Sequence, residues 1–121
     1  MKKEDRDIWS RWLLERRFGG NEAAMQAALT KYLYPWRDEI LSHANLQEGE
    51  ILLDVGCGDG LIAFGALEKV KTSRAIFSDI SQDLRDHAKS LAQEMNVLDH
   101  CQFVNASADD LSMIEIHYPF A

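Results

Sequence analysis

The segment LLDVGCGDGLIAFGA, residues 52–66, constrains the possible folds of this chain more than any other part of the sequence. An apolar run leads into a turn that carries glycines at alternate positions, Gly56, Gly58 and Gly60. Glycines in such a turn allow backbone conformations with positive φ and let a ligand approach the main chain closely. A second apolar segment follows at once, so the pattern predicts a buried strand, a tight turn and a helix.

Apolar runs of the same kind occur again further along the chain. The predicted strands are ILLDV (51–55), AIFSD (75–79) and CQFVN (101–105). Such short runs are typical of strands that are buried on both faces of a sheet. Helical patterns at 60–70 and 81–97 separate them, the second with Ser81 as its N-cap. Because strands alternate with helices, the sequence predicts right-handed crossovers and a parallel sheet.

The beginning of the chain is predicted to be helical. An amphipathic pattern covers 3–17, and two more helices are expected at 22–29 and 32–46. Asn21 is the expected N-cap of the second helix, and Pro35 lies in the first turn of the third.

Composition and charge exclude several classes of function. The formal net charge of -7 argues against direct contact with nucleic acid, which requires clustered Lys and Arg side chains. No apolar run approaches the roughly 20 residues that span a bilayer, and the charged start does not resemble a signal peptide, so a cytoplasmic protein is expected. The histidines lack the spacing of metal ligands, so no metal is expected. Cys57 and Cys101 are expected to be free thiols.

Three kinds of nucleotide site begin with a glycine-rich turn, and two of them fit this turn poorly. A P-loop requires Lys and then Ser or Thr after its last glycine, whereas Gly60 is followed by Leu61 and Ile62. A dinucleotide fingerprint that starts at Gly56 requires a glycine at position 61, which is Leu61. A nicotinamide-dependent oxidoreductase is therefore disfavoured.

Asp54 precedes the glycines, which gives the pattern D-x-G-x-G-x-G over 54–60. With this pattern at the end of the first strand, the sequence resembles the class I S-adenosylmethionine-dependent methyltransferases. The resemblance implies a Rossmann-like fold and S-adenosyl-L-methionine as cofactor, its methionyl part and ribose held by Asp54, Gly56, Gly58 and Gly60. This ligand carries a sulfonium cation and no phosphate, so a carboxylate beside the glycines is compatible with it.

Two further segments resemble the same family. Asp79 ends the second predicted strand, where the family's acid accepts hydrogen bonds from the ribose hydroxyls, and Ile80 would flank the adenine. The segment ASADDL is similar to the adenine-binding segment, with Ala108 as the backbone donor. The family's usual acid position is Ser107, so either Ser107 or Asp109 would accept from the adenine amine. Taken without the resemblance, Asp79 fits the role of a helix cap equally well, and ASADDL fits a turn before a short helix equally well.

The predicted architecture is an α/β chain with a helical cap at 1–46 and the N-terminal half of a Rossmann-like S-adenosylmethionine-binding domain at 47–121. Members of the family continue with strands that build the acceptor pocket, so this chain alone is expected to have little or no turnover. The resemblance implies a parent enzyme that methylates an acceptor, which the sequence does not identify. No residue is indicated as catalytic. In the strand order 3-2-1-4-5 the fourth strand pairs with the first, and without it the first strand keeps an open edge. The sequence therefore predicts either a homodimer through that edge or a fragment of a longer protein. The alternatives are a non-catalytic cofactor-binding or self-associating interaction module and a fragment of a nicotinamide-dependent oxidoreductase.

Overall fold

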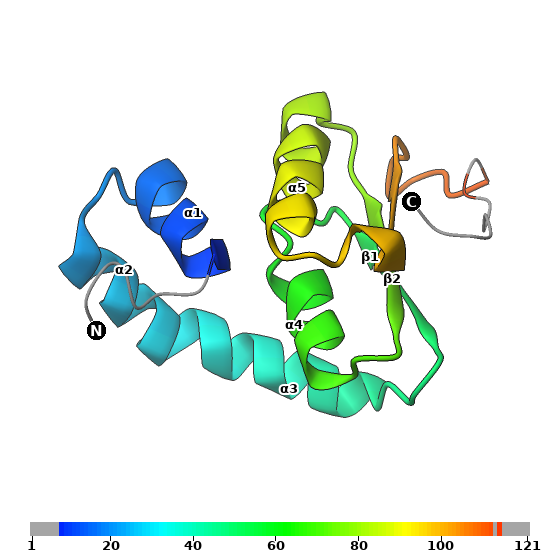
Figure 1. The fold of residues 1–121 in the computed structure, drawn as a ribbon, viewed down its shortest axis with the longest axis horizontal. Coiled ribbons are helices and arrows are strands. Elements are labelled where there is room, and N and C mark those ends of the chain that lie inside the picture. Colours follow the sequence, from blue (N-terminus) through cyan, green and yellow to red (C-terminus); the bar gives the residue numbers. More distant parts are fainter. Residues whose placement is uncertain (1–7, 113, 115–121) are drawn as a thin grey trace.

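The computed structural model describes residues 8–112 and 114, and Figure 1 shows a helical arm joined to a body that contains the sheet. The strands and the helices between them alternate as the sequence predicts. Positions 3–7 of the first predicted helix lie outside the described residues. The elements are α1 (Ile8–Arg17), α2 (Glu22–Ala28), η2 (Leu29–Leu33), α3 (Tyr34–Ala44), β1 (Ile51–Val55), α4 (Leu61–Lys69), β2 (Arg74–Ser78), α5 (Gln82–Glu94), η3 (Leu98–His100) and β3 (Cys101–Val104).

Elements α2, η2 and α3 form one continuous helical rod, where the sequence predicts two separate helices. That prediction is wrong because the chain passes through a π-helical turn, in which the N–H of Tyr34 donates to the carbonyl of Leu29. Pro35 has no N–H, and its ring would clash with a carbonyl of the preceding turn in a regular α-helix, so a wider turn accommodates it. The rod begins after the predicted N-cap Asn21 and ends at Asn45, which has the left-handed conformation.

The strands form a parallel three-stranded sheet in the order β1-β2-β3, which agrees with the predicted neighbours. Leu53 of β1 pairs with Ile76 of β2, and Phe77 of β2 pairs with Phe103 of β3. Strand β2 ends at Ser78, one residue earlier than predicted, so Asp79 lies just beyond the strand. Within residues 8–112 and 114, no strand pairs with the second edge of β1.

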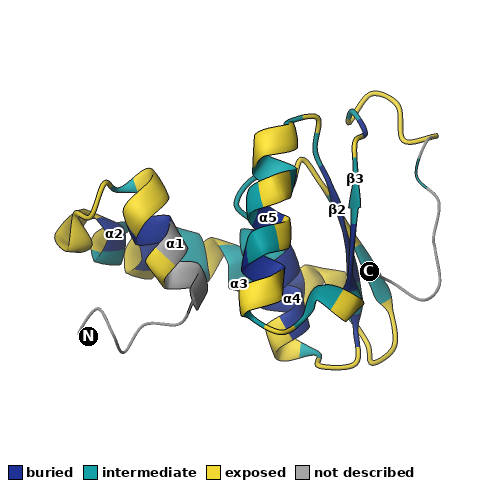
Figure 2. Ribbon diagram, turned by 45° about the horizontal axis from the view of Figure 1, so that its top comes forward, coloured by how far each residue is buried: buried dark blue, intermediate teal, exposed yellow. Residues whose placement is uncertain are grey.

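Figure 2 shows that α4 and α5 cover one face of the sheet. Phe77 is fully buried on that face, where its ring centroid lies 4.9 Å from the centroids of Phe64 and Phe103. The prediction that β1 is buried on both faces is wrong, since Leu53 and Val55 are 40% and 37% exposed. Side chains alternate across a strand, and in the described part of the chain only one face carries helices.

Helix α1 connects the arm to the body. It packs against both α2 and α5, and its buried residues Leu13 and Leu14 join the same core cluster as Met25 of α2 and Leu91 of α5. The last turn of α1 lies near the turn that follows β1, since Arg17 pairs there with Asp59. No helix among the described residues is long and apolar enough to cross a membrane.

Candidate functional site

The three glycines of the turn after β1 all have positive φ. The values are +68° at Gly56, +53° at Gly58 and +83° at Gly60, which is also the N-cap of α4. A Cβ atom at Gly60 would lie 2.5 Å from the ring of Phe64, whereas nothing lies within 4 Å of a Cβ placed at Gly56 or Gly58. The turn is therefore closely packed at its third glycine and open above the first two.

Backbone hydrogen bonds hold this turn against the end of β2. The N–H groups of Gly56 and Cys57 donate to the carbonyl of Ser78, at 2.7 and 3.0 Å. The N–H of Gly58 donates to Oδ2 of Asp79 at 3.1 Å. The glycine turn and Asp79, which lie far apart in the sequence, are thus in direct contact.

Asp79 contacts the backbone on two sides. Its Oδ1 accepts from the N–H of Ser81 at 2.9 Å, while Ser81 itself caps α5 through the N–H of Leu84. The side chain of Arg85 donates to the carbonyl of Asp79 at 3.0 Å. A carboxylate has about four lone-pair sites, so each oxygen of Asp79 retains one for a further donor.

Asp54 has a buried carboxylate oxygen that finds no hydrogen-bond partner among the described residues. This atom is Oδ2, and the N–H of Ala63 in the first turn of α4 bonds to the same carboxyl group. Burial raises the pKa of Asp54 to about 6; the bond from Ala63 opposes this rise, and the negative charge of Asp79 adds to it. An unpartnered buried acceptor is costly unless a donor reaches it, so this atom fits a ligand that carries a cationic donor.

The segment after β3 lies beside the end of β2. The hydroxyl of Ser78 donates to the carbonyl of Ala106 at 3.3 Å. Ser107 then forms a bridge with Asp110, and its hydroxyl accepts from the N–H of Asp109 at 3.1 Å. Ala108 and Asp109 are exposed at the tip of this turn.

The predicted site residues therefore meet at the carboxyl edge of the sheet, although they are not equally enclosed. Ile80 is 70% exposed and contributes an apolar side chain at this edge. A cavity of about 570 Å³ reaches from the glycine turn toward the arm, and of the predicted residues Asp54, Gly56 and Gly58 line it. The other predicted residues lie outside its lining; these are Gly60, Asp79, Ile80, Ser107, Ala108 and Asp109.

Most of the cavity wall comes from residues that the sequence did not indicate. Their side chains are mainly apolar and come from α1 or the loop after it, from η2 and α3, from β1 and from the start of α4. Trp36 is the largest of them and is 54% exposed. A helical pattern alone does not show which helix crosses which strand, so these residues carried no sequence signal. The wall includes Leu13, Phe18, Leu33, Trp36, Ile40, Leu52, Leu53, Val55, Leu61 and Ile62.

An ion pair joins the arm to the glycine turn. Nε of Arg17, in the last turn of α1, lies 2.6 Å from Oδ2 of Asp59, which stands between the second and third glycines. Both residues line the cavity. Their opposite charges were visible in the sequence, but nothing there indicated that the end of α1 meets the turn.

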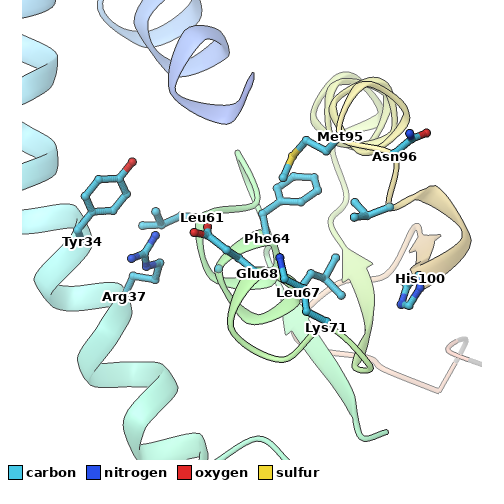
Figure 3. A pocket seen from close by; sticks show the side chains of 12 residues that line it. Tyr34, Arg37, Leu61, Phe64, Leu67, Glu68, Lys71, Met95, Asn96 and His100 are labelled. Carbon is cyan, nitrogen blue, oxygen red and sulfur yellow. The ribbon is translucent and has the colours of Figure 1, made fainter. Parts of the chain in front are cut away.

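A second cavity, of about 290 Å³, lies among α3, α4 and the end of α5. Figure 3 shows Tyr34 and Arg37 on one side of it, Phe64 in the middle, and Met95 and His100 on the other side. None of the predicted site residues lines it.

Two polar side chains of this second cavity, Arg37 and His100, already have partners within the chain. Arg37 pairs with Asp38 at 2.9 Å and lies over the ring of Tyr34, and Nδ1 of His100 lies 2.9 Å from the carbonyl of Ser73. The described residues contain no group of three or more His, Cys, Asp or Glu side chains arranged for a metal ion.

Comparison with known families identifies the glycine turn. A family model described as a methyltransferase domain matches residues 52–119, which begin in β1 and include the turn. The chain belongs to this methyltransferase family. The match confirms the class I S-adenosylmethionine-dependent methyltransferase predicted from the D-x-G-x-G-x-G pattern, together with its cofactor and its Rossmann-like fold.

Relatives of this methyltransferase domain include enzymes named for quinone biosynthesis. A ubiquinone/menaquinone biosynthesis C-methyltransferase of Rickettsia prowazekii is 32% identical over 81 residues, which cover 63% of this chain and 32% of that enzyme. A demethylmenaquinone methyltransferase of Oceanobacillus iheyensis is 30% identical over 86 residues, covering 70% of this chain and 36% of that one. The chain thus spans about a third of the length of these curated relatives.

Solved methyltransferases share the fold. An RNA methyltransferase from Salinibacter ruber, in complex with S-adenosyl-L-homocysteine, superposes with a TM-score of 0.59 at 29% identity, covering 65% of this chain and 51% of that one. Coclaurine N-methyltransferase bound to N-methylheliamine and S-adenosylhomocysteine also gives a TM-score of 0.59, at 23% identity, covering 69% of this chain and 24% of that one. The second likeness concerns the fold alone.

Proposed function

We propose that this methyltransferase domain binds S-adenosylmethionine at the carboxyl edge of its sheet and presents the methyl group to an apolar ring acceptor. The observation that carries the proposal is the open space above Gly56 and Gly58, next to a buried carboxylate oxygen of Asp54 that has no partner. A turn without Cβ atoms admits the methionyl part of the cofactor, and the cationic ammonium group supplies the donor that Asp54 lacks.

We expect the remaining contacts to the cofactor to come from residues at the same carboxyl edge of the sheet. We expect the remaining lone pairs of Asp79 to accept from the ribose hydroxyls, and the exposed side chain of Ile80 to lie against one face of the adenine. The turn at Ser107, Ala108 and Asp109 supplies a backbone N–H and polar acceptors to the edge of the adenine. Gly60 acts indirectly, because it closes the turn against Phe64.

The cavity wall favours an apolar acceptor. When bound, S-adenosylmethionine supplies an activated methyl group, so the protein mainly aligns the nucleophile with it. Trp36 and Phe18, together with the aliphatic side chains of the wall, can hold a flat ring of low polarity beside the glycine turn. The quinone biosynthesis enzymes among the relatives support this acceptor class.

Calorimetric titration of the chain with S-adenosylhomocysteine, S-adenosylmethionine and NAD tests the cofactor. We expect binding of the first two ligands and none of NAD. An Asp79→Ala variant should lose at least tenfold in affinity, whereas Asp86→Ala, an exposed carboxylate on α5, should bind like the wild type. Binding of NAD alone would support an oxidoreductase, and binding of none of the three would contradict the proposal.

Quenching of tryptophan fluorescence by a short-chain benzoquinone tests the acceptor separately. We expect saturable quenching that is mostly lost in Trp36→Phe, because Trp36 lines the cavity. Transfer of a labelled methyl group to the corresponding quinol then measures turnover. A chain that binds cofactor and quinone without turnover would be a non-catalytic cofactor-binding module.

A further inference from the structure

Arg17 lies where the arm meets the glycine turn. It is the last residue of α1, directly after a second cation, Arg16. Nε of Arg17 lies 2.6 Å from Oδ2 of Asp59, which follows Gly58 in the part of the turn where the backbone is open. Of the two arginines, only Arg17 lines the cavity beside the glycine turn.

This cavity has few charged side chains in its wall. In the described part of the chain, the wall contains two carboxylates, Asp54 and Asp59, and one cationic side chain, that of Arg17. The other side chains of the wall are mainly apolar, so they offer no partner to a charged group of a ligand. An anionic group that enters this end of the cavity therefore has Arg17 as its cationic partner.

The ion pair with Asp59 leaves most of the guanidinium group available. A guanidinium carries several N–H donors in a fixed plane, and the contact with Asp59 is made through Nε. The terminal amino groups can then donate to a second anion while Nε keeps the first. Asp59 thus holds the guanidinium group in place beside the turn.

The methionyl end of S-adenosylmethionine carries an ammonium group and a carboxylate on the same carbon atom. The proposed function assigns the ammonium group to the buried oxygen of Asp54. The carboxylate must then lie at the same end of the cavity, where the negative charges of Asp54 and Asp59 oppose it unless a cation balances them.

We propose, on the basis of the proposed function, that Arg17 binds the carboxylate of the methionyl end. The terminal amino groups of Arg17 donate to this carboxylate, while Asp59 holds the guanidinium group through Nε. Opposite charges then alternate from Asp59 through Arg17 and the two ligand groups to Asp54. The last turn of α1 becomes part of the cofactor site, and Arg17 makes that site selective for ligands that keep the carboxylate.

Calorimetric titration with two ligands that differ only in the carboxylate tests this role. S-adenosylhomocysteine carries the carboxylate, whereas its decarboxylated form, S-adenosyl-3-thiopropylamine, keeps the adenosine and the ammonium group. We expect the wild-type chain to bind S-adenosylhomocysteine about tenfold more tightly, because the second ligand lacks one hydrogen-bonded charge pair. Arg17→Gln should bind S-adenosylhomocysteine about tenfold more weakly than the wild type, and the decarboxylated ligand at least as tightly.

Two further variants identify the cause. Arg16→Gln removes a cation from the same turn of α1 but outside the cavity wall, so it should discriminate between the two ligands like the wild type. Arg17→Lys keeps the charge without the planar donors and should retain part of the discrimination. Binding of the decarboxylated ligand also shows that each variant is folded.

Three results would overturn the role of Arg17. Equal weakening of both ligands in Arg17→Gln would mean that the residue acts only through the position of α1. Discrimination that survives in Arg17→Gln would assign the carboxylate to another group, such as the backbone N–H groups at the start of α4. A wild-type chain that binds both ligands equally tightly would show that no cation recognises the carboxylate. A chain that binds neither ligand would instead contradict the proposed function, and the role of Arg17 with it.

Discussion

Arg17 and Asp59 connect the end of α1 to the glycine turn, with Nε of Arg17 2.6 Å from Oδ2 of Asp59. The Arg17 side chain is 60% exposed, so water and salt screen this ion pair. The pair therefore contributes more to the position of α1 than to the stability of the fold.

We expect Arg17→Ala to lower the free energy of unfolding by no more than about 1 kcal/mol. The loss should shrink at high salt, because the pair is exposed. Urea denaturation at low and high ionic strength measures it, with Arg11→Ala on the same helix as the control. A loss several times larger, or one that salt does not change, would mean that Arg17 acts through packing.

Gly60→Ala should destabilise the chain by about 2–4 kcal/mol, because the positive φ disfavours a side chain and the added Cβ meets the ring of Phe64. Gly49→Ala separates the two causes. Gly49 has a φ of +79° but nothing within 4 Å of its Cβ position, so only the cost of the backbone conformation remains, about 1 kcal/mol. Thermal denaturation of both variants checks the difference, and equal losses would contradict the clash.

Asp54 should make the free chain less stable as the pH rises from about 4 to about 6. Its pKa is raised from 3.8 to about 6 in the folded state, so the folded chain binds the proton more tightly than the unfolded chain. The stabilisation is complete below the unfolded pKa and is lost as pH rises through the folded pKa, by up to about 3 kcal/mol.

Asp54→Asn should remove this pH dependence and leave the free chain at least as stable as the wild type at pH 7. Urea denaturation between pH 4 and 7 measures it, and Asp86→Asn, an exposed carboxylate, should retain the wild-type slope. An unchanged slope in Asp54→Asn would show that another group causes the pH dependence.

Asp79→Asn should retain more stability than Asp79→Ala. Its carboxylate accepts from the N–H groups of Gly58 and Ser81, and an amide can keep one of these bonds whereas alanine keeps neither. We expect losses of about 1 kcal/mol for Asn and about 2–3 kcal/mol for Ala. Hydrogen exchange at the Gly58 amide checks the cause, since it should accelerate most in Asp79→Ala.

The sequence predicted the features that depend on local patterns. The strands, the helix after Gly60 and the Ser81 cap follow from apolar periodicity and from the chemistry of single residues. The family and its cofactor followed from the glycine spacing and Asp54, because the turn places a ligand directly on the backbone.

The features that depend on tertiary packing were not predictable in the same way. The exposure of Leu53 and Val55 depends on what covers the second face of the sheet, which a strand's own residues do not show. The contact between Arg17 and Asp59 depends on the direction in which the rod carries α1. Pro35 lies at the start of α3 but inside the continuous rod, because the π-helical turn before it has no sequence pattern of its own.

The π-helical segment at 29–33 has a mechanical consequence for the cavity. It lies in the rod between α2, which carries α1, and α3, which carries Trp36 and Ile40. A bend confined to this wide turn would separate Arg17 from Asp59 and also Leu13 and Leu14 from Leu91 of α5, so the packing of α1 on the body fixes the direction of the rod.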